Sequence, residues 1–146
     1  MPTPTKIADK WFSLYIRFRD ALEFQKEVPD ADISFGRCCT CGKIGQWKYM
    51  DCGHFISRGR GGGSGVRWDE RNAHLQCKPC NGGFYAGTNT RTKVDEAYKQ
   101  FMLEKYGQAV IDQLEFLDRN QSYHGKILGI GLMYKQMYED LRGKDD

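Results

Sequence analysis

Two pairs of cysteines constrain the fold of this 146-residue chain more than any other feature. Cys38 and Cys41 form the first pair, which Gly42 follows, and Cys77 and Cys80 form the second, with 35 residues between the pairs. A two-residue spacing lets both thiolates reach one tetrahedral ion at about 2.3 Å, and the glycine permits a tight turn. We therefore expect a structural zinc ion with four thiolate ligands and no position open for a substrate.

Two other cysteines lie near these pairs. Cys39 could replace Cys38 as the first ligand, although CxC is a poorer spacing than CxxC. Cys52 is expected to be a small buried residue beside the zinc site.

The chain carries no segment that suggests export or a membrane span. Its first residues lack the basic start and apolar run of a signal peptide, and no stretch approaches about eighteen apolar residues. We therefore expect a cytoplasmic protein, and in a reducing compartment six cysteines favour metal binding over disulfides.

The length predicts one domain over residues 1–146, and the residue pattern divides it into three segments. Apolar residues recur at steps of three and four over 5–28, which predicts an N-terminal helix. The segment 34–93 is rich in Gly, Cys and Arg, with short strand-like pieces such as QWKYM and VRW. Residues 94–146 return to a helical pattern, with Gly129 and Gly131 weakening the last helix.

Positive charge concentrates in the cysteine-rich segment. Residues 34–93 hold ten lysines and arginines against three acids, a net of +7, while the rest of the chain has a net of −4. The stretch SRGRGGGSGVR, residues 57–67, combines a glycine-rich loop with three of these arginines. This pattern favours a polyanionic partner, and we expect Arg58, Arg60, Arg67 and Arg71 to contact DNA phosphates, although a solvated basic surface remains the alternative.

Polar residues between and after the cysteine pairs form a second pattern. Asp51 precedes His54 by three positions, Asn72 follows in the sequence ERNAHLQC, and Asn81 comes directly after Cys80. Taken alone, Asp51 and His54 would suit a turn aspartate and a core histidine. Their order together with Cys-x-x-Cys-Asn resembles the HNH or ββα-metal nuclease motif, and the span from Cys38 to Asn81 is similar to phage endonuclease VII.

A longer resemblance covers most of the chain, from about Trp11 to Arg142. The stretches CTCG, QWKYMDCGH, VRWDERNAHLQCKPCN, KYGQAVIDQLE and YKQMYEDLR resemble the NinG/Rap recombination endonucleases of lambdoid phages. This resemblance implies an α+β fold, in which N- and C-terminal helices flank a zinc-bound treble-clef, HNH-like core at 34–93.

The same resemblance implies a metal-dependent endonuclease that cuts branched or Holliday-junction DNA in phage recombination, in the cytoplasm of the host cell. His54 would be the general base, and Asp51 and Asn81 would hold Mg²⁺ or Mn²⁺. Asn72 would orient the loop that carries His54, or else be a plain turn residue. Symmetric junction cutting needs two active sites, so we expect a homodimer built from the outer helices.

A different class of function fits part of the same pattern. A non-catalytic zinc-dependent module that binds nucleic acid would share the cysteines and the basic loop, but it would not need His54. Three other residues lie near the motif. His74 is expected to pack or face solvent, Trp68 either to pack or to stack on a base, and His124 to have no role.

Overall fold

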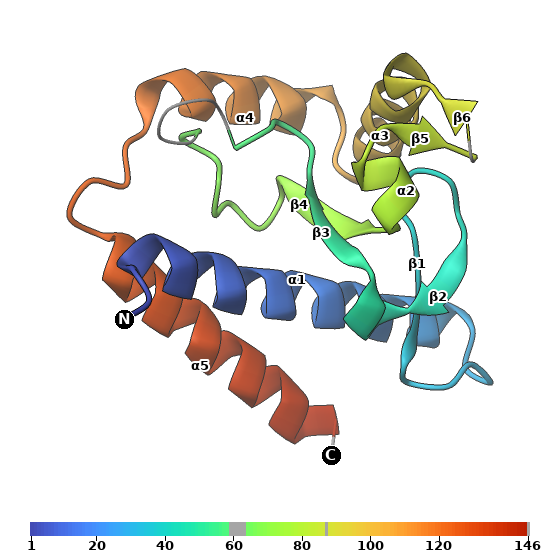
Figure 1. Cartoon of the computed structure of the whole chain (residues 1–146), viewed down its shortest axis with the longest axis horizontal. Coiled ribbons are helices and arrows are strands. Elements are labelled where there is room, and N and C mark those ends of the chain that lie inside the picture. The colour runs from blue at the N-terminus through green and yellow to red at the C-terminus, as the bar shows by residue number, and fades with distance from the viewer. Residues whose placement is uncertain (59–63, 87, 146) are drawn as a thin grey trace.

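A long N-terminal helix runs through the middle of the computed structural model, which describes residues 1–58, 64–86 and 88–145 (Figure 1). This helix, α1, spans Pro4–Glu27 and begins with a Thr3 cap whose hydroxyl accepts a hydrogen bond from the Lys6 amide at 3.2 Å. Proline at the first helical position suits that start, because its missing N–H would be unpaired there. The helix starts and ends one residue earlier than the sequence pattern predicted.

Short strands, four more α-helices and one 3₁₀ helix follow α1 in the described residues, so the chain mixes helix and strand as expected. Their bounds are β1 Phe35–Arg37, β2 Ile44–Gln46, the 3₁₀ helix η1 Trp47–Tyr49, β3 Asp51–His54, β4 Ala73–Gln76, α2 Lys78–Asn81, β5 Phe84–Tyr85, β6 Thr88–Asn89, α3 Arg91–Lys105, α4 Gln108–Asn120 and α5 Ile127–Asp145. In the described residues each sheet is one antiparallel pair: β1 with β2, β3 with β4, and β5 with β6.

Both expected strand-like pieces are wrong, because only Gln46 of QWKYM lies in a strand. QWKYM forms the end of β2 and then η1, whereas residues 66–68 form turns. The Ser64 hydroxyl accepts a hydrogen bond from the Val66 amide at 2.9 Å, and the Asp69 carboxylate accepts one from the Arg71 amide at 2.9 Å. Such local bonds from side chains to amides favour turns over a sheet ladder.

The antiparallel pair of β3 and β4 carries much of the polar motif. Its register places Asp51 opposite Gln76 and His54 opposite Ala73. Gly53 lies opposite His74, and a Cβ there would overlap the Gln76 side chain. Glycine at position 53 therefore lets the two strands approach closely enough to hold Asp51 and His54 in place.

Helices α1 and α5 pack side by side and run in the same direction (Figure 1). Phe12 contacts Tyr134 with ring centroids 4.9 Å apart, and Phe18 contacts Tyr138 at 6.0 Å. A Cβ on Gly131 would lie 3.1 Å from the Ala8 amide nitrogen. Gly131, one of the glycines expected to weaken α5, therefore lies at a close approach of the two helices.

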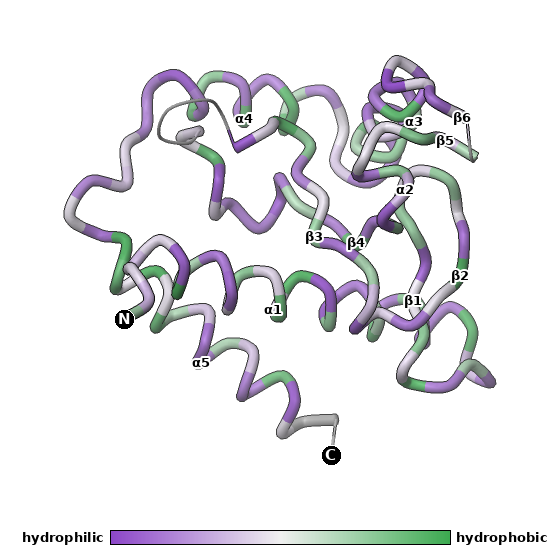
Figure 2. Tube along the Cα trace, viewed as in Figure 1, coloured by the Kyte–Doolittle hydropathy of each residue, from purple (hydrophilic) through white to green (hydrophobic). Residues whose placement is uncertain are grey.

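Buried side chains form three groups, and α1 contributes to two of them. One group surrounds Phe18, Trp47 and Leu75 next to the paired cysteines, and a second lies between α1 and α5. The third joins α3 and α4 to the turn at Val66. Hydrophobic and hydrophilic residues alternate along α1 and α5 (Figure 2). No helix in the described part of the chain is long and apolar enough to cross a membrane.

Candidate functional site

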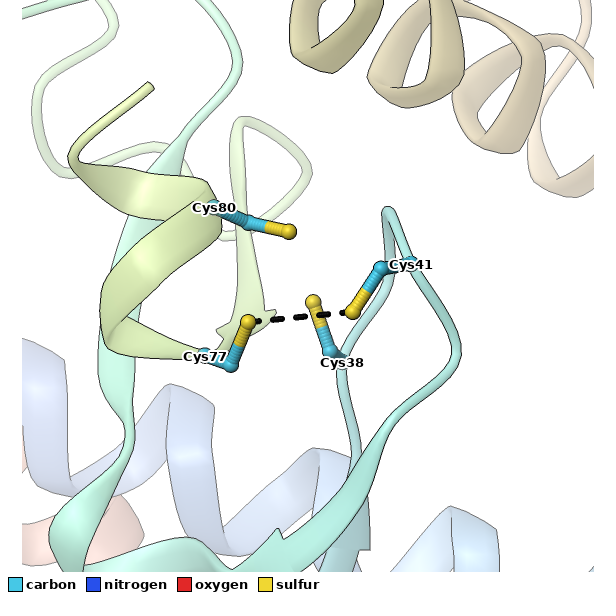
Figure 3. Close-up of side chains that lie close together, drawn as sticks. All are labelled: Cys38, Cys41, Cys77 and Cys80. Carbon is cyan, nitrogen blue, oxygen red and sulfur yellow. Dashed lines mark hydrogen bonds between the residues drawn. The ribbon is translucent and has the colours of Figure 1, made fainter. Parts of the chain in front are cut away.

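The four paired cysteines converge on one point. Cys38 and Cys41 come from the turn after β1, Cys77 directly precedes α2, and Cys80 lies on it (Figure 3). Their sulfur atoms all lie within 4.8 Å of one another, and the Cys41 and Cys77 sulfurs are 3.7 Å apart. Four thiolates at about 2.3 Å from one tetrahedral ion would have sulfur separations of about 3.8 Å. The cluster can therefore bind a metal ion such as zinc.

The surroundings of the cluster favour a thiolate at one of its members. Burial would raise the pKa of the Cys38 thiol, but hydrogen bonds from the Cys41 amide and the Thr40 hydroxyl outweigh it and lower the pKa to about 7. The Thr40 hydroxyl lies 3.2 Å from the Cys38 sulfur and 3.3 Å from the Gln76 amide nitrogen, so it links the cluster to β4. Cys39 lies outside the cluster and packs with the α3–α4 group, so Cys38 and not Cys39 belongs to the cluster that could bind the ion.

A groove of about 1020 Å³ lies beside this cluster, between α1, β3, α2 and the start of α3. Asp51, His54 and Asn81, predicted from separate parts of the sequence, all line it. Among the described residues, positive charge dominates its walls, with seven lysines and arginines against three aspartates. The cations are Lys6, Lys10, Arg17, Lys48, Arg58, Lys78 and Arg91, and the acids are Asp9, Asp51 and Asp95.

His54 is held by a backbone carbonyl at the edge of the groove. Its Nε2 lies 2.8 Å from the Arg67 carbonyl oxygen. The Phe12 ring packs against the imidazole, with the two ring centroids 5.8 Å apart. A carbonyl oxygen only accepts hydrogen bonds, so Nε2 carries the proton of the neutral ring and the lone pair of Nδ1 is left available. Burial lowers the pKa of His54 to about 4, so the ring is neutral at physiological pH.

Asp51 on β3 and Asn81 at the end of α2 contact each other in the wall of the groove. The Asn81 side-chain amide donates to one carboxylate oxygen of Asp51 at 3.0 Å, and Lys78 donates to the other at 2.7 Å. Arg91 in turn donates to the Asn81 backbone carbonyl at 3.1 Å. A carboxylate and a side-chain amide from residues 30 positions apart therefore lie together in the wall of the groove.

Asn72 connects the two arms of the loop that follows His54. It is fully buried; its side-chain oxygen accepts from the Ile56 amide at 2.9 Å, and its amide donates to the carbonyls of Ile56 and Val66 at 3.0 and 3.2 Å. Val66 directly precedes Arg67, whose carbonyl holds the His54 ring. Asn72 therefore ties both the segment after His54 and the segment that orients its ring, which is more than a plain turn residue does.

The arginines predicted to contact DNA that lie in the described part of the chain have different surroundings. Arg58 lines the groove and reaches Asp9 at 3.5 Å, whereas Arg67 makes two hydrogen bonds to the Asp9 carboxylate, at 3.1 and 2.6 Å. Arg71 makes two hydrogen bonds to Asp69 instead. Arg60 lies outside the described residues. Phosphate contacts by Arg67 and Arg71 stay predictions, and a phosphate would have to compete with these ion pairs.

Sequence reasoning missed most of the cations that line the groove. Lys6, Lys10 and Arg17 belong to α1, outside the segment that carries the net positive charge. Their steps of four and seven residues place them on one face of that helix, and this spacing was a signal available in the sequence.

The other residues singled out in the sequence have structural contacts. His74 is fully buried, with its Nε2 2.8 Å from the Tyr106 hydroxyl. Trp68 is 5% exposed and donates from its indole to Asp9 at 2.9 Å, so it packs and presents no face for a base to stack on. Cys52 is partly buried, packs against the group between α1 and α5, and is not a member of the four-cysteine cluster.

Comparisons with known proteins agree with the resemblance seen in the motifs. A family model described as Bacteriophage Lambda NinG protein matches residues 5–143. Protein ninG of Salmonella phage P22 is 29% identical over 140 residues, which cover 94% of this chain and 57% of that protein, so the chain spans little more than half of its relative. No solved structure matches the chain. Because the family model covers nearly its whole length, the chain belongs to the NinG family of bacteriophage proteins.

Proposed function

We propose that this protein is a metal-dependent DNA endonuclease with an HNH-like core, and that its substrate is branched or Holliday-junction DNA formed in phage recombination. One observation carries the proposal: His54, Asp51 and Asn81 line a single basic groove next to the four-cysteine cluster. The order β3, β4, α2 also matches the two strands and helix of the ββα-metal motif. Hydrolysis of a phosphodiester needs a base, a cation and donors that hold the backbone, and this groove offers residues for each role.

His54 is the general base in this proposal. With its Nε2 proton held by the Arg67 carbonyl, the ring offers Nδ1 to a water molecule in the groove. Nδ1 takes a proton from that water as its oxygen bonds to phosphorus, and the bond from phosphorus to the leaving ester oxygen breaks. A ring that is neutral at physiological pH accepts this proton without first losing one.

Asp51 and Asn81 are the ligands for the catalytic cation. Carboxylate and amide oxygens are the donors that Mg²⁺ and Mn²⁺ prefer, and the two side chains already lie within hydrogen-bond distance. The Asn81 nitrogen faces the Asp51 carboxylate, and a half-turn of the amide would direct its oxygen to a cation that Asp51 binds. A bound cation would supply charge stabilisation for the phosphate and the leaving oxygen.

The groove cations hold the DNA backbone. Seven basic side chains reach the groove from α1, η1, the loop after β3, α2 and α3. A strand that enters between them would meet positive charge on both walls, and each phosphate contact would make binding weaker at higher salt. Lys78 would exchange its contact with Asp51 for a phosphate when the cation binds, because both compete for the same carboxylate.

A zinc ion in the four-cysteine cluster keeps the two halves of the site together. Asn81 directly follows Cys80, and Cys38 is linked through Thr40 and Gln76 to the strand that faces Asp51. Zinc would therefore set the distance between the Asp51 strand and the Asn81 helix.

The choice of junction DNA rests on the family resemblance, and it brings a homodimer into the proposal. Two cuts on one junction need two active sites related by symmetry. The exposed side of α5 supports a homodimer built from the outer helices. Leu128 and Leu132 lie there one turn apart and are 51% and 53% exposed, whereas Gly131 and Tyr134 face α1. A mass measurement in solution and a four-way junction assay test these two points directly.

The nuclease proposal is tested by cleavage of supercoiled plasmid and of a synthetic four-way junction with Mg²⁺, comparing wild type with His54→Ala. Loss of a general base is expected to slow cutting by about 10²- to 10⁴-fold while DNA binding stays intact. His124→Ala is the matched control, because His124 is exposed and lies outside the groove. Binding without cutting by the wild type would instead support a non-catalytic zinc module, and equal cutting by wild type and His54→Ala would exclude the assigned base.

A further inference from the structure

A second, smaller pocket opens next to the groove. It has a volume of about 340 Å³ and is formed by β2, η1 and the first turn of α2. Most of its lining residues are apolar or aromatic, and two are lysines. The lining residues are Lys43, Gly45, Gln46, Tyr49, Met50, Cys77, Lys78 and Pro79. Met50 and Lys78 line both the pocket and the groove, so the two adjoin.

Tyr49 is the most exposed aromatic side chain in the described part of the chain, at 71%, and its backbone is firmly held. Trp47, two residues earlier, is 2% exposed and packs on Phe18. The Arg17 guanidinium donates to the carbonyls of Trp47 and Lys48 at 3.3 and 3.1 Å. With Trp47 anchored in the core, the short 3₁₀ helix directs Tyr49 outward. An exposed ring on a fixed backbone loses little freedom when a flat ligand stacks on it.

Positive charge surrounds this aromatic pocket. Lys43 and Lys78 lie on its walls, and Lys48 precedes Tyr49 and lines the groove. An apolar pocket with an aromatic wall and lysines at its edge matches a nucleotide whose base enters the pocket and whose phosphates stay outside. Neither an uncharged apolar peptide nor a second copy of this basic segment would use those lysines.

We propose that the pocket beside Tyr49 receives an unpaired nucleobase from a DNA strand whose backbone lies in the groove. This inference rests on the proposed function, and it adds a feature by which the site selects its substrate. A base in an intact duplex is stacked and paired, and moving it into a side pocket costs free energy; an unpaired base at a branch point, bulge or single strand avoids most of that cost. The pocket would therefore favour DNA with unpaired nucleotides.

The test compares binding of the zinc-loaded protein, without added Mg²⁺, to three labelled DNAs: a single strand, a fully paired duplex, and the same duplex with one extrahelical 2-aminopurine. Tyr49→Ala is expected to weaken binding to the single strand and the bulged duplex by between about fivefold and about 150-fold, the range of base stacking on an aromatic side chain. Binding to the paired duplex should change by less than about twofold, because backbone contacts dominate there.

Two variants make the comparison specific. Tyr49→Phe keeps the ring and should keep the wild-type preference, together with the change in 2-aminopurine fluorescence on binding. Phe116→Ala removes an aromatic ring that is 59% exposed on α4, outside both the pocket and the groove, and should bind all three DNAs as the wild type does.

The outcomes separate this inference from the nuclease proposal. Equal effects of Tyr49→Ala on all three DNAs, or none, overturn the base pocket even if the wild type cuts DNA. A selective loss with unpaired DNA supports the pocket even if no DNA is cut, in which case only the nuclease reading fails. A wild type that binds none of the DNAs overturns both.

Discussion

Replacing Asn72 by alanine tests the side chain that links the segment after His54 to the segment that orients its ring. The substitution removes three buried hydrogen bonds, one from the Ile56 amide and two to the carbonyls of Ile56 and Val66. Each lost bond costs about 0.5 to 1.5 kcal/mol, and a buried group left without a partner costs more. We therefore expect the free energy of unfolding to fall by about 2 to 4 kcal/mol, a large share of the stability of a domain this size.

The same substitution should also affect His54 without touching it. Freeing Val66 loosens the next residue, Arg67, whose carbonyl fixes the His54 ring. Under conditions where the variant is still folded, DNA cleavage should therefore slow well beyond what the folded fraction accounts for. Urea unfolding followed by circular dichroism measures the free energy of unfolding, and plasmid nicking at low temperature measures the rate of DNA cleavage.

Asn120→Ala is the matched control for this experiment. Asn120 is exposed and its amide donates only to the Phe116 carbonyl one turn earlier in α4, at 2.8 Å, so its loss should change stability by no more than about 0.5 kcal/mol. If Asn72→Ala costs as little as Asn120→Ala, the three bonds do not hold the loop. If it destabilises the protein but cuts at the wild-type rate once folded, the loop does not orient His54.

Three other predictions concern the metal, the histidine and the helix contact. Purified protein should contain one zinc per chain by elemental analysis; Cys80→Ser should lose it while Cys39→Ala, altered just outside the cluster, retains it, and zinc retention by Cys80→Ser would contradict the four-thiolate site. The folded pKa of His54, about 4, lies below its ordinary 6.5, so the unfolded chain binds the proton more tightly. The free energy of unfolding should therefore fall as the pH drops from 6.5 to 4, by at most about 3 kcal/mol from this group. His54→Gln should reduce this dependence of the unfolding free energy on pH, measured by urea titrations. Gly129→Ala, with nothing within 4 Å of the new methyl, should stabilise α5 by up to about 1 kcal/mol, whereas Gly131→Ala should gain nothing or lose stability against Ala8; equal melting temperatures for the two variants would show that the close contact is absent.

Local patterns in the chain predicted the helices well. The apolar period of α1 and the later helices is a local property, so it predicted helices within a few residues of those observed. The two CxxC pairs likewise predicted a cluster that could bind a metal ion, because thiolate spacing limits what one ion can reach. The strand expected at residues 66–68 was wrong, since Ser64 and Asp69 bond to nearby amides and favour turns there.

Contacts between distant segments could not be read from those patterns. Arg67 and Asp9 are 58 positions apart, and nothing local indicates that α1 would pair with that arginine. The same holds for Asn72 as a link between Ile56 and Val66. The spacing of the α1 cations places them on one face of that helix, but it does not indicate that this face lines the groove. Periodicity and ligand spacing depend on a few neighbouring residues, whereas the partner of a charged or polar side chain depends on which faces the packed elements share.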